Sequence, residues 1–323
     1  MNAAIFYLTQ NTEIRKVYLK TSLYFLFKNF NEKYKYPVII LHEGDFDHES
    51  QTEIILSIRK SCRSLVSFRA LDKEDFELPS HIDKKKLDAC VATNATPYWR
   101  NIKYRMMCRW WIKYFPKYMK GYDYVMRLDD DSIIEETIPD IFNWMKDKNL
   151  IYSSNLLHVD CGICCYGMKD FFKKHFNDND KIDKLFMTQD VNMRTVLMHP
   201  FRELLSITQD PLPELTESIK LYSPIMYYNN FFMTKTDFWS REDVKKLIDD
   251  IDKDGSIFYF RWGDAPLQSL IVMLLANENQ VDRCIFKYSK RMQRESFYGN
   301  DKIYHSYMPD IYTKTSCITE EQK

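Results

Sequence analysis

The sequence predicts an α/β fold in which a mixed, mostly parallel central sheet is flanked by helices. Apolar segments of strand length alternate with stretches of helical period, which is typical of parallel strands joined by crossover helices. The first such unit is a strand over 3–8, a helix over 13–31 and, after Pro37, a strand over Val38–Leu41. A hydrophobic fraction of 45 % in 323 residues is enough for one large core.

The remaining elements follow from the same periodicities, with prolines and polar runs marking their ends. We predict helices over 50–60, 104–114, 139–147, 171–175, 190–197, 240–250 and 267–276, and strands over 65–68, 122–128, 151–166 and 231–234. Several prolines favour a long loop over 209–226. No internal repeat or linker interrupts the pattern, so we expect a single domain over 1–316 and a disordered tail over 317–323.

The composition excludes several classes of nucleotide-handling protein. The chain carries 46 basic and 46 acidic side chains, whereas proteins that bind nucleic-acid backbones usually carry a clustered basic excess, so we expect no nucleic-acid partner. Its 7 glycines form neither G-x-G-x-x-G nor G-x-x-x-x-G-K-[ST], which removes the dinucleotide fingerprint and the P-loop. A nucleotide would have to be held another way, and a metal bound by carboxylates is the obvious alternative.

The sequence gives no sign of membrane insertion. No segment approaches the roughly 18–20 consecutive apolar residues that a membrane span needs. The N-terminus lacks the basic and apolar regions of a signal peptide. We therefore expect no transmembrane segment in this chain, and either a soluble protein or a catalytic domain separated from an anchor.

The strongest local feature is the run Asp129-Asp130-Asp131, which follows the predicted strand over 122–128. In open α/β sheets, ligands bind beyond the carboxyl ends of the strands. The carboxylates of Asp129 and Asp131 could converge on one hard cation, Mg²⁺ or Mn²⁺, which prefers oxygen ligands and offsets the charge of a diphosphate. Three consecutive acids fit a solvated turn equally well.

A second feature is the run Arg261-Trp262-Gly263-Asp264-Ala265-Pro266, just before a predicted helix. Asp264 could cap that helix, and Pro266 is tolerated in its first turn. The functional alternative makes Asp264 the acceptor for a substrate hydroxyl, with Arg261 beside a phosphate or carboxylate.

A third feature is Phe238-Trp239-Ser240-Arg241-Glu242-Asp243, where aromatic rings precede two acids. A flat ring such as Trp239 suits stacking on a sugar, and Glu242 or Asp243 suits chemistry at an anomeric carbon. The local pattern favours a plainer interpretation, in which Trp239 packs against the core and the acids complement the helix dipole.

Two further candidates come from a helix and from the C-terminal region. Arg105 and Arg109 lie four residues apart on one predicted helix face, where they could flank a pyrophosphate or pair with nearby acids. His305 could be a third ligand to a cation held by Asp129 and Asp131, although a lone histidine is more often a structural hydrogen-bonder.

Taken together and in this order, these blocks resemble one family. The sequence is similar to the fungal-type α-1,2-mannosyltransferases of the Ktr group, retaining glycosyltransferases with the Rossmann-like, nucleotide-sugar-binding GT-A fold. The similarity runs over residues 3–276 and rests on Leu8–Asn11, Phe30–Pro37, Tyr104–Arg109 (the family's Tyr-Arg-x-Met-Cys-Arg block), Tyr122–Leu128, Phe238–Ser240 and Arg261–Pro266. The Arg-Trp-Gly-Asp-Ala-Pro run is identical to the family's and is the most specific of these.

The resemblance implies transfer of mannose from GDP-mannose to a sugar hydroxyl, with Mn²⁺ (or Mg²⁺) and retention at the anomeric carbon. The acceptor would be an oligosaccharide, a glycoprotein or a glycolipid. It implies that Asp129 takes the place of the family's metal-binding Glu, with Asp131 sharing the metal and His305 as the late metal-contacting histidine. Asp243 takes the place of the candidate nucleophile, and Glu242 beside it could substitute.

The resemblance also assigns the remaining positions of the site. Asp264 and Tyr104 match further residues of the catalytic site, and residues 1–135 form the nucleotide-sugar and metal half, with 136–316 as the acceptor half. The residues expected to bind the nucleotide sugar are Arg105, Arg109, Arg127, Arg261 and Trp239.

The chain departs from the family at the metal site, where Asp129-Asp130 stands in place of the usual Glu-Pro. The resulting Asp-x-Asp leaves open a UDP-sugar donor, and a non-catalytic sugar- or nucleotide-binding homologue is a second alternative. Attack could use Asp243 in a double displacement or come from the same face as the departing diphosphate. The family resemblance implies the Golgi or secretory lumen, whereas the lack of an anchor leaves a cytoplasmic or viral location open.

Overall fold

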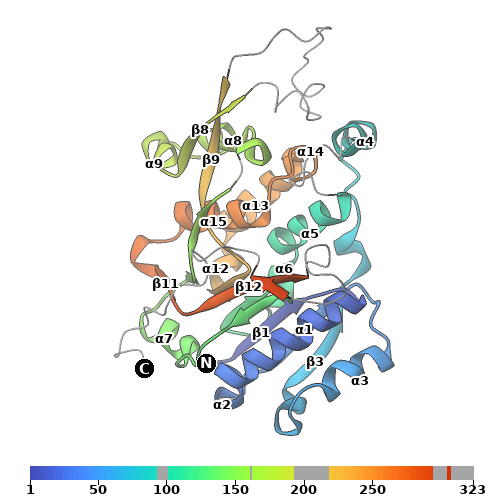
Figure 1. Cartoon of the computed structure of the whole chain (residues 1–323). Coiled ribbons are helices and arrows are strands. Elements are labelled where there is room, and N and C mark those ends of the chain that lie inside the picture. The colour runs from blue at the N-terminus through green and yellow to red at the C-terminus, as the bar shows by residue number, and fades with distance from the viewer. Residues whose placement is uncertain (93–100, 161, 193–217, 294–303, 307–323) are drawn as a thin grey trace.

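The computed structural model describes residues 1–92, 101–160, 162–192, 218–293 and 304–306 (Figure 1). A seven-stranded sheet with the order β11-β6-β10-β4-β1-β2-β3 forms its centre. The strands are β1 (Ala3–Leu8), β2 (Val38–His42), β3 (Val66–Ala70), β4 (Tyr124–Leu128), β6 (Tyr152–Ser154), β10 (Phe231–Lys235) and β11 (Val281–Arg283). Only β10 runs antiparallel to its neighbours in this sheet, so the predicted mixed, mostly parallel sheet is confirmed.

Helices cover both faces of this sheet. The α-helices of the described residues are α1 (Glu13–Leu26), α2 (Glu32–Tyr34), α3 (His48–Leu56), α4 (Lys84–Ala92), α5 (Ile102–Lys113), α6 (Phe115–Tyr118), α7 (Ile141–Asp147), α8 (Met168–His175), α9 (Asn179–Lys184), α12 (Thr236–Ser240), α13 (Glu242–Asp254), α14 (Ser256–Tyr259) and α15 (Asp264–Leu275). In β1, Phe6 joins the core beneath α5 and α15, whereas Ile5 and Tyr7 join the core beneath α1. Side chains alternate between the faces of a strand, so an uninterrupted apolar β1 is explained by burial on both sides.

The edge of the sheet where β1, β2 and β4 end carries the polar residues of interest. Parallel strands place their carboxyl ends at one edge, so Thr9 and Asp129 lie close together after β1 and β4. Because β10 is antiparallel to β4, with Phe231 opposite Leu128, it begins at this same edge. Asn229 and Asn230, which precede β10, are thereby brought beside the acidic run.

Two three-stranded sheets complete the described part of the fold. One comprises β5 (Ser132–Ile134), β12 (Tyr288–Gln293) and β13 (Tyr304–Ser306), and the other comprises β7 (Leu157–Val159), β9 (Ser218–Tyr227) and β8 (Phe186–Asn192). In Figure 1, β8 and β9 lie beside α8 and α9, above the main sheet. In the first sheet, Lys290 of β12 pairs with Ser132 of β5, which places β12 directly beside the acidic run.

The region from 186 to 227 differs most from the prediction. The segment 190–197 is predicted to be a helix, but its first residues belong to strand β8. The segment 209–226 is predicted to be a loop, but from residue 218 it belongs to strand β9. Pro224 is accommodated because it stands where β9 changes partner from β8 to β7, so no ladder hydrogen bond requires its missing N–H. The rest of both predicted segments, and the predicted tail over 317–323, lie outside the described residues.

The structure also answers the question of membrane insertion for the residues it describes. Within the described ranges, no helix combines the length and the apolar character needed to cross a bilayer.

Candidate active site

The acidic run forms a tight turn between β4 and β5. The N–H of Asp129 donates to the carbonyl of Asn230 at 2.9 Å, and the N–H of Ser132 donates to the carbonyl of Asp129 at 2.9 Å. Asp130 points toward the end of β1, where it accepts hydrogen bonds from Thr9 Oγ1 at 2.7 Å and Arg15 Nη1 at 2.8 Å. The three acids therefore do not form a solvated turn: Asp130 is 3 % and Asp131 5 % exposed.

Arg127, the last but one residue of β4, joins two of the predicted site residues. Its Nε donates to Asp129 Oδ1 at 3.0 Å, and its Nη1 donates to Asp264 Oδ2 at 2.6 Å. The guanidinium also lies over the ring of Trp111, 3.7 Å from the centroid. Burial disfavours the charge of Arg127, but the two carboxylates outweigh it and raise the pKa of this side chain.

Asp264 reaches this group from the first turn of α15. Gly263 is the N-cap residue, so the capping role predicted for Asp264 is wrong, although its charge still complements the helix dipole. Asp264 Oδ2 accepts a second hydrogen bond, from Asn229 Nδ2 at 2.9 Å. Asn229 and Asn230 thus tie the start of β10 to both carboxylates, since Asn230 Nδ2 donates to Asp129 Oδ2.

A lysine that the sequence reasoning did not single out completes the group. Lys290 Nζ lies 3.1 Å from Asp129 Oδ2 and 3.2 Å from Asp131 Oδ1. Burial opposes the charge of Lys290, but Asp131 and Asp129 outweigh it and raise its pKa well above the usual value. Burial raises the pKa of Asp131 to about 6, with Lys290 opposing the shift.

The same cluster could hold a divalent cation. The ammonium of Lys290 is itself a cation at the point where the carboxylates of Asp129 and Asp131 converge, and carboxylate oxygens are the donors that Mg²⁺ and Mn²⁺ prefer. Among the described residues, no three His, Cys, Asp or Glu side chains gather around one point, so the protein would supply two carboxylates and leave other positions to phosphate oxygens or water. His305 stands opposite Met292, two residues along β12 from Lys290.

Arg261 and Tyr104 lie together near the N-terminus of α15. Arg261 adopts a left-handed backbone conformation with φ of 64°, which turns the chain just before Asp264. Its guanidinium carbon lies 5.8 Å from the ring centroid of Tyr104, and its Nη2 lies 3.8 Å from Asp160 Oδ1. The structure therefore places these two predicted residues close to one another, beside the turn that carries Asp264.

Three residues predicted to bind the nucleotide sugar make contacts between elements of the fold. Arg109 on α5 forms a two-pronged ion pair with Asp252 on α13, at 2.6 and 3.1 Å. Arg105 is fully buried and donates to the carbonyl of Phe258. Trp239 is 3 % exposed and donates its ring N–H to Thr234 Oγ1 at 2.8 Å, as the plainer interpretation of that segment predicts.

Asp243 and Glu242 lie apart from the cluster, in the exposed first turn of α13. Asp243 accepts a hydrogen bond from Arg241 Nε at 3.0 Å, which lowers the pKa of its carboxyl. Arg241 in turn donates to the carbonyl of Leu275, the last residue of α15. Because Asp264 is the first residue of this 12-residue helix, about 16 Å of helix separates the two ends.

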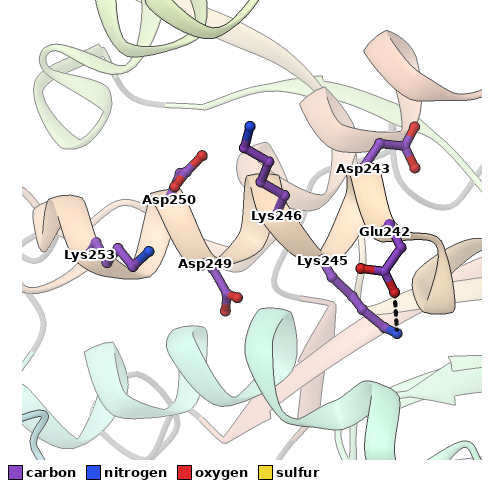
Figure 2. Close-up of a pocket in the computed structure, with 7 residues that line it drawn as sticks. All are labelled: Glu242, Asp243, Lys245, Lys246, Asp249, Asp250 and Lys253. Atoms are coloured by element: carbon purple, nitrogen blue, oxygen red, sulfur yellow. Dashed lines mark hydrogen bonds and ion pairs between the residues drawn. The ribbon is translucent and has the colours of Figure 1, made fainter.

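The surface around Asp243 is formed by one charged helix. Figure 2 shows the residues that line a pocket at this surface, which all come from α13: Glu242, Asp243, Lys245, Lys246, Asp249, Asp250 and Lys253. These charged side chains extend from the helix without an aromatic ring or a second element among them. The structure therefore does not bring Asp243 to Asp129 and Asp264, and the position assigned to it by resemblance is not at this edge of the sheet.

Known proteins match the chain along most of its length. A family model described as glycolipid 2-alpha-mannosyltransferase matches residues 1–318. The O-glycoside alpha-1,2-mannosyltransferase omh1 of Schizosaccharomyces pombe is 26 % identical over 291 residues, 87 % of this chain and 66 % of that protein. The glycolipid 2-alpha-mannosyltransferase of Saccharomyces cerevisiae is 24 % identical, over 85 % of this chain and 57 % of that protein. The chain thus spans less than two thirds of the length of these relatives.

Solved structures agree with the fold. The mannosyltransferase Ktr4p from S. cerevisiae in complex with GDP has a TM-score of 0.69 and 19 % identity, covering 99 % of this chain and 83 % of that one. Core-mannan synthase A from Aspergillus fumigatus, in its Mn/GDP form, has a TM-score of 0.67 and 22 % identity, covering 88 % and 72 %. At these identities the likeness shows the fold alone. Because the family model covers nearly the whole sequence, the chain belongs to the glycolipid 2-alpha-mannosyltransferase family of glycosyltransferases.

Proposed function

We propose that the protein transfers mannose from GDP-mannose to a sugar hydroxyl of a glycan acceptor, with retention of configuration, an α-1,2 linkage and dependence on Mn²⁺. The observation that carries the proposal is the cation position between Asp129 and Asp131, at the sheet edge where α/β folds bind ligands. The Mn/GDP form of the structural neighbour from A. fumigatus supports the choice of metal and nucleotide.

In this proposal Asp129 and Asp131 hold the metal, with His305 as a further candidate ligand. A bound divalent cation would neutralise the charge that develops on the departing diphosphate. Arg127 binds Oδ1 of Asp129 while Lys290 contacts Oδ2, so both oxygens of this carboxylate are oriented by a cationic side chain. Arg15 and Thr9 hold Asp130, which keeps its charge next to the site without making it a ligand.

Asp264 is the carboxylate that we propose for the acceptor hydroxyl. Arg127 and Asn229 both donate to its Oδ2, and the thiol of Cys108 contacts the same side chain. A carboxylate held in this way can accept a hydrogen bond from a substrate hydroxyl. Arg261 lies in the turn just before Asp264, and Tyr104 lies next to Arg261. Both residues are proposed to contact the substrate beside Asp264. The position of Asp243 at the far end of α15 favours attack from the same face as the leaving diphosphate, because this course requires no carboxylate nucleophile there.

The activity can be tested directly with purified protein. We expect release of GDP from GDP-mannose when Mn²⁺ and an α-mannoside acceptor are present, and nuclear magnetic resonance of the product should show a new α-1,2-mannoside. Asp129→Asn is expected to lower the rate of release roughly 10²–10³-fold, and Asp243→Asn serves as the matched control on the exposed first turn of α13. Absence of turnover with every nucleotide sugar tested, with or without mannosides, would refute the proposal.

The donor nucleotide needs a separate comparison, because the Asp-x-Asp spacing is also compatible with a UDP-sugar. With Mn²⁺ present, GDP should raise the melting temperature more than UDP at equal concentration, since a ligand that binds only the folded state stabilises it according to its affinity. A larger shift with UDP would assign the enzyme to UDP-sugars. Binding of either nucleotide without turnover would instead support a non-catalytic homologue.

A further inference from the structure

The ammonium group of Lys290 lies where a divalent cation would have to bind. It contacts Asp129 Oδ2 at 3.1 Å and Asp131 Oδ1 at 3.2 Å, so these two oxygens share one cationic partner. The other oxygen of Asp129 is bound by Arg127 Nε at 3.0 Å. A metal that used both carboxylates at this point would therefore meet the ammonium group on the same oxygens.

The backbone of Lys290 is fixed at this position by strand pairing. β12 is antiparallel to β5, with Tyr288 opposite Ile134 and Lys290 opposite Ser132. The hydroxyls of Tyr288 and Ser132 form a hydrogen bond of 2.7 Å that joins the same two strands. Lys290 is therefore held next to the residue that follows Asp131, and only its flexible four-carbon side chain is free to change position.

The charges around the site favour either Lys290 or a divalent cation, because without Lys290 two carboxylate charges of the cluster have no cationic partner. Four carboxylates, those of Asp129, Asp130, Asp131 and Asp264, meet three cationic side chains, those of Arg15, Arg127 and Lys290. Arg15 and Arg127 are each committed to other oxygens of the cluster. Lys290 is the cation that directly bridges the proposed metal ligands, and its side chain is 17 % exposed, so it has a path to solvent.

We propose that the ammonium group of Lys290 and a divalent cation are alternative occupants of the single position between Asp129 and Asp131. Lys290 is then the resident cation of the metal-free protein, where it keeps two neighbouring carboxylates together. The metal binds by displacing it, so Lys290 lowers the affinity for metal. The inference rests on the proposed function only for the identity of the metal and of the nucleotide.

A purely structural role for Lys290 predicts a different result. If the lysine only stabilised the turn, its removal would destabilise the protein and would leave metal affinity unchanged or weaker. If the lysine competes with the metal, its removal also destabilises the metal-free protein, because two buried carboxylates lose their partner. In that case, however, the affinity for metal rises, and bound metal restores the lost stability.

The test is Mn²⁺ binding to the whole chain, followed by electron paramagnetic resonance of the free ion, for the unaltered protein, Lys290→Met and Lys287→Met. Methionine has a similar length and no charge, and Lys287 is a matched control on the same segment, 50 % exposed and 3.8 Å from Glu135. We expect Lys290→Met to bind Mn²⁺ at least about tenfold more tightly, because a like charge has been removed from the site. Lys287→Met should bind like the unaltered protein.

Thermal unfolding keeps the test interpretable if Lys290→Met folds poorly. Without metal this variant should melt several degrees lower than the unaltered protein, and saturating Mn²⁺ should raise its melting temperature by more. A second variant, Lys290→Arg, retains the charge and should keep the weak Mn²⁺ affinity. Equal or weaker Mn²⁺ binding by Lys290→Met, or no binding by either protein with GDP present, would overturn the inference.

The outcome also separates this inference from the proposed function. If Lys290→Met and the unaltered protein bind Mn²⁺ equally while transfer of mannose still requires Mn²⁺, the function stands and the inference is wrong. If Lys290→Met binds more tightly but no donor is turned over, the competition stands and the proposed function is wrong.

Discussion

Two buried arginines, Arg109 and Arg127, form ion pairs with different consequences. Arg109 directs its fork at the single carboxylate of Asp252, and Lys113 binds the same carboxylate at 2.7 Å. Arg127 divides its donors between Asp129 and Asp264 and leaves one oxygen of each to other partners. We call Arg109 with Asp252 the closed pair, because both partners are used up in joining two helices. We call Arg127 with Asp129 and Asp264 the open pair, because it orients two carboxylates that can also bind a metal or a substrate.

The largest effect is expected from breaking the closed pair. Asp252→Ala leaves the guanidinium of Arg109 buried without its partner, which typically costs about 3–5 kcal/mol of stability. Urea unfolding should show this loss, while the folded fraction should transfer mannose at a rate within about twofold of the unaltered protein. A large fall in rate at unchanged stability would place Arg109 and Asp252 in the active site and would show that their ion pair is not purely structural.

The ion pair between Arg109 and Asp252 should also make the free energy of unfolding depend on pH. Burial alone would raise the pKa of Asp252, but hydrogen bonds from Arg109 and Lys113 outweigh it, so the pKa in the folded protein lies below its usual value. Its contribution is therefore complete above the unfolded pKa of about 4 and is lost as the pH falls through the folded pKa. The difference in unfolding free energy between the unaltered protein and Asp252→Asn should be constant from pH 7 to about 5 and shrink below about 4.

In the open pair, removal of charge should act on chemistry rather than on folding. Asp129→Asn keeps the shape of the side chain but removes a metal ligand, and we expect the transfer rate to fall roughly 10²–10³-fold. The melting temperature should change by only a few degrees. A loss of stability as large as that of Asp252→Ala would indicate that Asp129 and Arg127 have a structural role as well.

A smaller effect is expected from Arg127→Lys. A lysine keeps the charge but cannot bridge Asp129 and Asp264 with two separate donors or stack on Trp111. We expect roughly a tenfold lower rate and a weaker apparent affinity for Mn²⁺, measured from the metal dependence of initial rates. An unchanged metal dependence would show that Arg127 does not orient Asp129.

The smallest effect is expected at the position that resemblance alone assigned. Asp243→Asn removes an ion pair whose two side chains are 41 % and 48 % exposed, and exposed pairs contribute less than about 1 kcal/mol. The rate of transfer should stay within about twofold of the unaltered protein. A loss of a hundredfold or more would return Asp243 to the site and contradict its placement on α13.

The comparison also shows what the sequence can predict. Asp129 and Asp131 are predicted from their place after an apolar strand, and the carboxyl ends of parallel strands lie at one edge of a sheet whatever the rest of the chain does. Asp264 is predicted from its place at the start of a helix. These predictions rest on local patterns, as do the predictions of the strands and helices of the central sheet.

The remaining residues of the site have no local signal. Asn229 and Asn230 reach it only because β10 is antiparallel to β4, and Lys290 only because β12 pairs with β5. Periodicity does not encode the direction or the partner of a strand. Asp243 is the converse case. Its neighbours in sequence match a functional block, but α12 ends at Ser240 and Asp243 lies in the first turn of α13, away from the cluster.

The antiparallel course of β10 has a consequence for how the protein is made. The carboxylates at 129–131 emerge from the ribosome long before the residues that hold them, since Asn230 follows Asp129 by 101 positions and Lys290 follows it by 161. A nascent chain that ends near residue 135 has the acidic turn without these two partners. Contacts of such high sequence separation are slow to form and are among the last to be secured. Binding of the donor would therefore report that the C-terminal part of the chain has been synthesised and folded onto the rest.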